Sequence, residues 1–388
     1  MVSLLTRIFI KNHEDTTSPA VRQAYGVLCG GVGIFLNLLL FAGKFLAGFL
    51  SGSIAITADA INNLSDAGSS IIMLIGFKMA GQKPDPEHPF GHGRIEYLSG
   101  LAVAAAILLM AFELFKTSVK KLFAPTALTF SPLVVIILVV SILVKLYMFL
   151  YNRSISKKIG SEAMKATATD SLSDTVATAV VLLTTLIAHF TDLQLDAACG
   201  ILVALFIFYA GFNAAKETLN PLLGQSPDPD FVKEIEDTVL ENGAVLGIHD
   251  LLVHNYGPGR TMISLHAEVP ADGDILVLHD SIDNIERTLK EKLNCEAVIH
   301  MDPVCVNDPE VVALKKQICG FLTELDAALS LHDFRIVKGP THTNIIFDIL
   351  VPFRFRLTDG EIISCMEEKV KALDPNYFLV VNVDKKYA

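Results

Sequence analysis

The chain has 388 residues, of which 52% are hydrophobic and 19% are charged, and its mean hydropathy is +0.48. This composition is too apolar for an ordinary soluble enzyme, so part of the chain is expected to face lipid. Residues 1–215 hold 15 basic and 13 acidic side chains, whereas residues 216–388 hold 16 and 29. Neither half has the basic stripe of a nucleic-acid-binding protein, and no nucleic-acid partner is expected.

Six apolar stretches follow a mixed segment at residues 1–24. They lie at about 25–50, 54–80, 97–120, 130–151, 163–189 and 194–215. Each is near the ~20 residues that a helix needs to cross ~30 Å of hydrocarbon. The second and fifth are the least clear by hydropathy, because both carry acids in mid-span. The pattern predicts a six-helix transmembrane bundle over 25–215 in a multi-pass protein of the cell membrane.

The basic residues predict how these spans are oriented. They gather in the N-terminal segment and in the loops 81–96 and 152–162: Arg7, Lys11, Arg22, Lys83, Arg94, Arg153, Lys157 and Lys158. The opposite loops carry few, apart from Lys116, Lys120 and Lys121. Because basic residues favour the cytoplasmic side, both termini are expected in the cytoplasm, with 1–24 as a cytoplasmic N-terminal segment.

The chain changes character after about residue 216, where hydropathy falls and Asn220-Pro221 interrupts the pattern. The following residues favour a helix at 230–242, strands at 249–256 and 260–269, a helix at 276–293 and a strand at 296–301. This order is typical of a small α+β domain, which we place at 216–307.

The remaining residues repeat that pattern at an offset of 82 or 83. His249-Asp250-Leu251 returns as His332-Asp333-Phe334, and the run from Val298 to Asp302 returns as Val380 to Asp384. We therefore predict a duplicated domain with a second copy at 308–388. The copy has lost most of the histidines, since the matching positions are His332, Asp348, Glu361, Asn382 and Asp384. It is expected to serve packing, although Asp348 and Asp384 leave weak metal binding open.

Two apolar stretches carry acids where lipid is expected. One reads Asn62-Asn63-Leu64-Ser65-Asp66 and the other reads Asp170-Ser171-Leu172-Ser173-Asp174. Positions i and i+4 share one face of a helix, so each stretch presents two oxygen donors. Helix-to-helix hydrogen bonding accounts for a single asparagine. Three intramembrane carboxylates cost ~2.5–3.5 kcal/mol each and repel one another, which favours a metal or proton site.

The donor set favours a hard cation. Three carboxylates and an amide oxygen suit Mn²⁺, Mg²⁺ or Ca²⁺. Neither stretch contains the histidine that commonly accompanies Zn²⁺. Affinity for divalent metals normally rises from Mn²⁺ towards Cu²⁺, so a manganese site has to avoid nitrogen and sulfur donors, with which Zn²⁺ would bind more tightly.

Two further groups of residues have the types and spacing of metal ligands. In the 81–96 loop they are Asp85, His88 and His92. A structural alternative is that His92 and Arg94 pair with acids at the membrane surface. In the domain at 216–307 five potential ligands occur: His249, His266, His279, His300 and Asp302.

In combination, these features resemble the cation diffusion facilitator family over about 25–303. The resemblance rests on six spans, the two intramembrane pairs, the loop His88-Pro-Phe-Gly-His92-Gly-Arg94 and the ending His300-Met-Asp302. It implies homodimeric exporters of divalent transition metals driven by proton antiport, with a ferredoxin-like αββαβ cytoplasmic domain. The Asn/Asp and Asp/Asp pairs look like the bacterial manganese branch. The resemblance assigns nothing to 310–388.

The resemblance also implies site residues. The transport site falls on Asn62, Asp66, Asp170 and Asp174. The loop site falls on Asp85, His88 and His92, and the cytoplasmic site falls on His249, His266, His279, His300 and Asp302.

We expect a Mn²⁺/H⁺ antiporter without enzymatic activity or a resident cofactor. The three aspartates bind the metal, Asn62 adds an amide oxygen, and protons compete for the carboxylates as the helices rock. Export of Zn²⁺, Fe²⁺, Co²⁺ or Cd²⁺ by the same mechanism stays open, as does a membrane metal sensor without transport. An intramembrane metalloenzyme would need a motif such as HExxH, which the sequence lacks.

Overall fold

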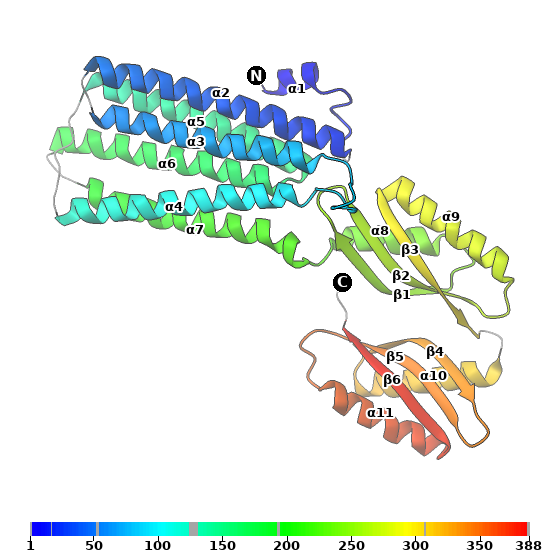
Figure 1. The fold of residues 1–388 in the computed structure, drawn as a ribbon. Coiled ribbons are helices and arrows are strands. Elements are labelled where there is room, and N and C mark those ends of the chain that lie inside the picture. Colours follow the sequence, from blue (N-terminus) through cyan, green and yellow to red (C-terminus); the bar gives the residue numbers. More distant parts are fainter. Residues whose placement is uncertain are drawn as a thin grey trace. The chain divides into compact units, whose positions relative to one another are not determined.

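The structure, a computed structural model, describes residues 2–16, 18–51, 54–123, 131–191, 195–305 and 308–385. The chain forms two compact units: Met1–Gln225 with Asn255–Arg260, and Ser226–His254 with Thr261–Ala388 (Figure 1). Residues 1, 17, 52–53, 124–130, 192–194, 306–307 and 386–388 lie outside the described residues, and they include the first residue of the predicted stretches 130–151 and 194–215.

The first unit consists of helices. They are α1 (Val2–Phe9), α2 (Pro19–Ser51), α3 (Ile54–Ala80), α4 (Ile95–Phe123), α5 (Pro132–Ile159), α6 (Glu162–Thr191), α7 (Asp196–Leu219) and the 3-10 helix η1 (Asn220–Leu223). Helices α2 to α7 cover the six predicted stretches, whereas no element was predicted at α1. Among the described helices, α2, α4, α5, α6 and α7 are long and apolar enough to cross a membrane. Helix α3, which carries Asp66, is outside that set of five.

The ends of α5 place it directly beside α6. Helix α5 begins at Pro132, where the missing N–H of proline costs nothing. It ends at Ile159 and is capped by Gly160, whose φ of 58° is the left-handed conformation that glycine adopts without strain. Helix α6 begins two residues later, at Glu162. This short connection makes α5 and α6 neighbours, so a residue in the middle of α5 can reach the middle of α6.

Helices α2 and α3 pack closely through small residues. A Cβ atom added at Gly30 of α2 would lie 2.9 Å from Cβ of Leu74 on α3. Small side chains at such positions let helix backbones approach each other within a membrane. The same contact buries Cys29, Met73 and Phe77 in one apolar cluster that also includes Met148 of α5.

Two modules of the same element order make up most of the second unit. The first module is α8 (Pro229–Leu240), β1 (Gly247–Asn255), β2 (Thr261–Pro270), α9 (Ile275–Leu293) and β3 (Cys295–Val304). The second module is α10 (Pro309–Leu325), β4 (Ser330–Lys338), β5 (Thr343–Val351), α11 (Asp359–Leu373) and β6 (Tyr377–Lys385). Each module thus has the order αββαβ, which is the order the resemblance implied.

Each module has a three-stranded sheet, with the orders β1-β2-β3 and β4-β5-β6. The last two strands of each sheet are parallel, with His266 opposite His300 and Asp348 opposite Asn382. Alternate residues of β2 and β5 are buried against the helices, as the two-residue period of a strand requires. The helices leave the other residues of these strands less covered.

Local details recur at matching positions of the two modules. Helices α8 and α10 both begin with an Asp-Pro pair, in which Asp228 and Asp308 accept hydrogen bonds from the first helical turn. In the first strand of each module, Asp250 and Asp333 have φ of 52° and 51°. A left-handed conformation is uncommon outside glycine. Its occurrence at both positions is a shared structural feature of the modules.

Candidate functional site

Three carboxylates converge inside the helical unit. Asp66 lies on α3, and Asp170 and Asp174 lie one turn apart on α6. Each offers an oxygen, and these oxygens all lie within 4.8 Å of one another. Only 13% of the Asp66 and Asp174 side chains is exposed, and Asp170 is buried. The structure thus brings together three members of the predicted transport site.

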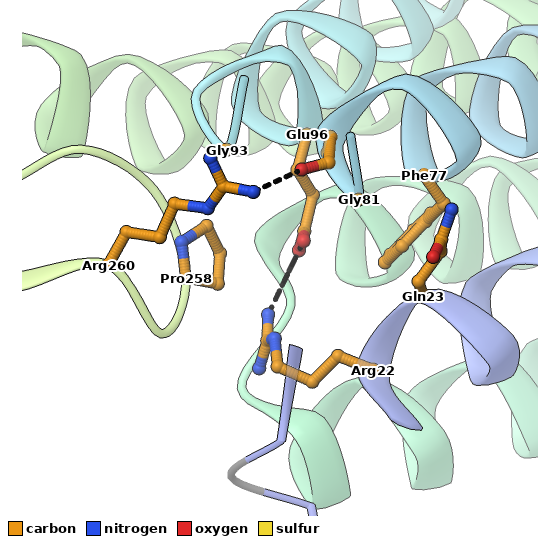
Figure 2. A pocket seen from close by; sticks show the side chains of 9 residues that line it. Arg22, Gln23, Phe77, Gly81, Gly93, Glu96, Pro258 and Arg260 are labelled. Atoms are coloured by element: carbon orange, nitrogen blue, oxygen red, sulfur yellow. Dashed lines mark hydrogen bonds and ion pairs between the residues drawn. The ribbon is translucent and has the colours of Figure 1, made fainter. Parts of the chain in front are cut away.

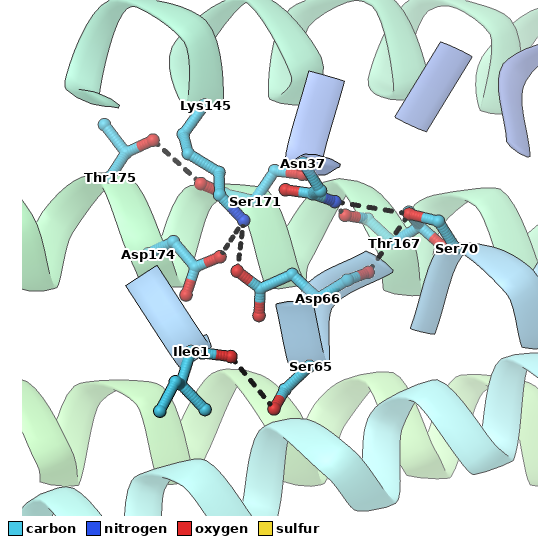
Figure 3. Close-up of polar contacts among 10 residues, drawn as sticks. All are labelled: Asn37, Ile61, Ser65, Asp66, Ser70, Lys145, Thr167, Ser171, Asp174 and Thr175. Carbon is cyan, nitrogen blue, oxygen red and sulfur yellow. Dashed lines mark hydrogen bonds and ion pairs between the residues drawn. The ribbon is translucent and has the colours of Figure 1, made fainter. Parts of the chain in front are cut away.

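A lysine from a third helix lies among these carboxylates. The Lys145 ammonium on α5 donates to Oδ2 of Asp66 and to Oδ2 of Asp174, each at 2.6 Å (Figure 3). Its side chain is only 5% exposed. Sequence reasoning missed Lys145, although it is the one charged residue between 132 and 152. A lone charge in so apolar a stretch needs a partner, and that was the available signal.

Polar groups from α2 and α3 continue beside the carboxylates. Asn37 of α2 donates to Ser70 Oγ at 3.4 Å, and Ser70 Oγ donates to the Asp66 backbone oxygen at 3.2 Å (Figure 3). Oδ1 of Asn37 and Oγ of Ser141 on α5 are buried, and neither has a hydrogen-bond partner among the residues that the structure describes. These groups make the interior between α2, α3, α5 and α6 polar in a stretch where the helices are otherwise apolar.

The fourth predicted ligand is placed differently. Asn62 lies one turn before Asp66 on α3 and is exposed, whereas the neighbouring Asn63 is buried. The spacing of Asn62 and Asp66 on one helix face is as expected, but the exposure of Asn62 leaves its role as a ligand a prediction.

The loop before α4 forms a second group. Nδ1 of His88 and Nε2 of His92 each lie 3.4 Å from a carboxylate oxygen of Asp85. Backbone N–H groups of His88 and Glu87 donate to Asp85 at 2.7 and 3.0 Å, and these bonds lower the pKa of Asp85 below its usual value. Nδ1 of His92 is buried and has no hydrogen-bond partner in the described ranges of the chain. The three predicted residues are therefore close enough to share a cation.

Residues around a small pocket in the same unit hold the loop before α4 in place. Residues from α2, α3, α4, the loop and the segment 255–260 line this pocket: Arg22, Gln23, Phe77, Ala80, Gly81, Gly93, Glu96, Pro258 and Arg260 (Figure 2). Arg260 donates to the backbone oxygen of Gln82 at 2.6 Å. A buried ion pair of 3.2 Å joins Arg22 to Glu96 at the start of α4. These contacts hold both ends of the loop, so the pocket has a structural role.

The first module contains a third group. Oδ2 of Asp302 lies 3.1 Å from Nε2 of His249 and 2.8 Å from Nδ1 of His266. His300 lies opposite His266 in the sheet, with Nε2 3.4 Å from Asp302 Oδ1. His279 is separate, because its side chain on α9 is 63% exposed and pairs with Asp283. Four of the five predicted residues are neighbours, and the role of His279 stays a prediction.

Buried carboxylates that converge among long apolar helices, joined to α+β modules with histidine–aspartate clusters, define a membrane protein that binds metal cations. Comparison with known proteins agrees with this class. The family model described as the cation efflux transmembrane domain matches residues 32–223. The model described as the cytoplasmic domain of cation efflux proteins matches 227–304. The second module lies beyond the matched residues.

Curated relatives point to the same family. An uncharacterised transporter of Methanocaldococcus jannaschii is 34% identical over 269 residues, which covers 69% of this chain and 95% of the relative. The cation-efflux pump FieF of Escherichia coli is 28% identical over 291 residues, which covers 74% of this chain and 96% of the relative. The chain therefore belongs to the cation diffusion facilitator family of cation efflux transporters. These relatives are transporters, not enzymes.

Proposed function

We propose that the protein exports a divalent metal ion, with Mn²⁺ preferred, in exchange for protons. The observation that carries this proposal is the group of Asp66, Asp170 and Asp174 around Lys145. Three carboxylates and one ammonium have a formal charge of −2 when all are ionised. One dication neutralises that charge. A buried charge imbalance is costly in the membrane interior, so the site favours a dication over a monovalent ion.

Lys145 acts as a tethered cation in this proposal. Its ammonium already binds Asp66 and Asp174. A metal that uses those oxygens has to displace it, which weakens the net affinity for the metal. A transport site has to release its ion, so a competing internal cation suits export better than a site of maximal affinity. Once the metal has left, the ammonium returns to the carboxylates and neutralises part of their charge.

Protons supply the rest of the compensation. Crowded carboxylates without a metal repel one another, and burial disfavours their charged forms. Protons that enter from the side where the metal leaves therefore replace it, and they leave again when the next metal ion binds. Exchange of this kind couples metal export to a proton gradient. The helices alternate access by rocking around the site, as in other transporters with a site near the bilayer midplane.

The metal preference follows from the donors. The three carboxylates are hard oxygen ligands, which suit Mn²⁺. Zn²⁺, Fe²⁺, Co²⁺ and Cd²⁺ are the alternative cargoes of the same mechanism. The name of the Escherichia coli relative specifies cation efflux and no particular metal.

The membrane topology and assembly belong to the same proposal. Helix α3 has 27 residues, about 40 Å at 1.5 Å per residue, which is long enough to span a bilayer as the sixth helix. Its two aspartates and two asparagines lower its hydropathy. Six spans put both termini on one side, and the basic loops favour the cytoplasm. The two αββαβ modules represent a duplicated domain, and the protein works as a homodimer, as the family resemblance implies.

Transport by reconstituted protein tests this function. Proteoliposomes with an imposed pH gradient should take up Mn²⁺ in preference to Zn²⁺ when both are offered. Asp170→Asn should abolish uptake, because it removes a buried carboxylate of nearly the same shape. Glu113→Gln is the matched control, since Glu113 on α4 is exposed and pairs with Lys116 at the surface. Wild-type uptake by Asp170→Asn, or uptake that ignores the pH gradient, contradicts the proposal.

A further inference from the structure

Four ligand-type residues from both modules meet in one place. His332 lies on β4, Asp348 lies opposite it on β5, Asp384 lies on β6, and Asp250 comes from β1 of the first module. Each offers one nitrogen or oxygen atom, and all four atoms lie within 4.8 Å of one another. All four residues belong to the same compact unit. The group is separate from His266 and Asp302, which belong to the first module alone.

His249 links this group to the one in the first module. Its ring lies 4.4 Å from that of His332, measured between centroids. Nδ1 of His249 lies 3.4 Å from Oδ2 of Asp250, and Nε2 lies 3.1 Å from Oδ2 of Asp302. The histidine thus has a carboxylate at each ring nitrogen.

The rings of the two histidines are largely buried. The side chain of His249 is 6% exposed and that of His332 is 11% exposed. Within the described part of the chain, neither ring nitrogen of either residue has a hydrogen-bond partner. A neutral imidazole has one donor and one acceptor nitrogen. In that form, one nitrogen of His249 points its lone pair at a carboxylate oxygen. A cation between these atoms turns that repulsion into attraction on both sides.

The negative charge of the three aspartates also favours a bound cation. Asp250, Asp348 and Asp384 together carry three negative charges. In the part of the chain that the structure describes, the ion pairs of Asp250 and Asp384 are with histidines. The nearby Arg335 pairs with Asp333 instead, at 3.3 Å. Carboxylates gathered beside buried histidines without Lys or Arg therefore lack compensation, and a metal ion supplies it.

We propose that Asp250, His332, Asp348 and Asp384 form a metal site shared by the two modules. One imidazole nitrogen and three carboxylate oxygens suit a divalent transition metal such as Zn²⁺ or Mn²⁺. Because the first module supplies Asp250 and the second supplies the other three, the bound metal fastens one module to the other. The second module is thus a metal-binding partner of the first within one chain. This inference is independent of the transport proposal.

Counting bound metal in the purified full-length protein tests this site. Metal is removed with a chelator, Zn²⁺ or Mn²⁺ is added alone, and the equivalents bound per chain are measured by mass spectrometry. Asp348→Asn combined with Asp384→Asn keeps the side-chain shapes and removes two ligands. This double variant should bind one equivalent fewer than the wild type. Even the loss of a group that only hydrogen-bonds to a ligand costs ~10–100-fold in affinity, so loss of two ligands should exceed that.

Controls separate this site from its neighbours. Glu368→Gln changes an exposed carboxylate on α11 and should bind as much metal as the wild type. Asp170→Asn should lose only intramembrane binding and keep the equivalent held by the modules. Hydrogen exchange at β4 should slow when metal is added to the wild type, and it should not change in the double variant. Unchanged stoichiometry and affinity in the double variant overturn the proposal.

A variant of the first module keeps the test valid if the double variant does not fold. If circular dichroism shows that the double variant is unfolded, Asp250→Asn is measured instead. Asp250 lies outside the second module, so its substitution leaves the core of that module intact. It should lose the same equivalent of metal, and full metal binding by folded Asp250→Asn overturns the proposal.

Discussion

The Lys145 ammonium lies 2.6 Å from the Asp66 carboxylate, although the two residues are 79 positions apart in the chain. Both side chains are at least 87% buried, since 5% of Lys145 and 13% of Asp66 is exposed. An ion pair in such a place loses the hydration of both partners. Its retention makes sense when the lysine and the metal take turns at the same carboxylates.

Removal of the lysine charge should make stability depend on metal. Lys145→Met replaces the ammonium with an unbranched, uncharged side chain that is one atom shorter. It leaves buried carboxylates unpaired, and loss of one partner of a buried pair costs about 3–5 kcal/mol. In chelator the variant should therefore unfold at a lower temperature than the wild type. Mn²⁺ should raise its Tm by more than it raises that of the wild type, because the dication replaces the missing ammonium.

The matched control for this prediction is Lys116→Met. Lys116 is 49% exposed and pairs with Glu113 at the surface, where an ion pair contributes ~0–1 kcal/mol. Its Tm should stay close to that of the wild type with and without metal. Equal stabilisation of Lys145→Met and the wild type by Mn²⁺ would show that lysine and metal do not share the carboxylates.

The role of Asn62 is decided by a pair of neighbouring substitutions. Asn62→His adds a nitrogen donor at a predicted ligand position, which favours Zn²⁺. We expect the ratio of Zn²⁺ to Mn²⁺ uptake to rise about tenfold, which corresponds to about 1.4 kcal/mol. Asn63→His places the same group one residue away, on another side of the helix, and should not raise the ratio. If neither variant changes the ratio of initial rates, Asn62 is not a ligand.

Regular spacings in the sequence predicted much of the secondary structure. The four-residue spacing of Asp170 and Asp174 predicted that they share a helix face, and they do. The repeat also placed the strands of the second module, because β4, β5 and β6 begin at residues 330, 343 and 377, which are 83, 82 and 82 positions after β1, β2 and β3 begin at 247, 261 and 295. These features depend on local periodicity, which a single sequence displays directly.

The features that sequence reasoning missed depend on contacts between distant segments. Lys145 is a single residue in an apolar stretch, and no spacing links it to α3 or α6. Asp250 follows His249 in a strand, where successive side chains point to opposite faces. The left-handed conformation of Asp250, with φ of 52°, breaks that alternation, and His249 and Asp250 join one group with His332. The packing role expected for the second module, with weak metal binding at Asp348 and Asp384 left open, stays a prediction.

Two adjacent glycines of α2 test the close packing of the helices. Gly30→Ala puts a methyl group 2.9 Å from the Leu74 Cβ, whereas at Gly31 the added methyl group meets no described atom within 4 Å. Overpacking of a tight contact costs about 1–3 kcal/mol, so Gly30→Ala should lower the Tm of the detergent-solubilised protein. Gly31→Ala should leave it unchanged or raise it, since alanine favours helix over glycine. Equal Tm values for the two variants would mean that α2 and α3 are not in close contact at Gly30.

Substitution of two histidines in the first module tests whether His279 belongs to the predicted metal site of that module. In the structure His266 lies 2.8 Å from Asp302, whereas His279 is 63% exposed and pairs with Asp283 on its own helix. We therefore expect His266→Ala to weaken Zn²⁺ binding by at least about tenfold. Loss of a group that only hydrogen-bonds to a metal ligand already costs ~10–100-fold in affinity, and tenfold is the lower end of that range. His279→Ala should weaken it less than His266→Ala does. Isothermal titration of full-length protein that carries Asp348→Asn and Asp384→Asn isolates this site from the one shared by the modules. A loss in His279→Ala as large as that in His266→Ala would mean that α9 brings His279 to the metal in the bound state, as the family resemblance implies.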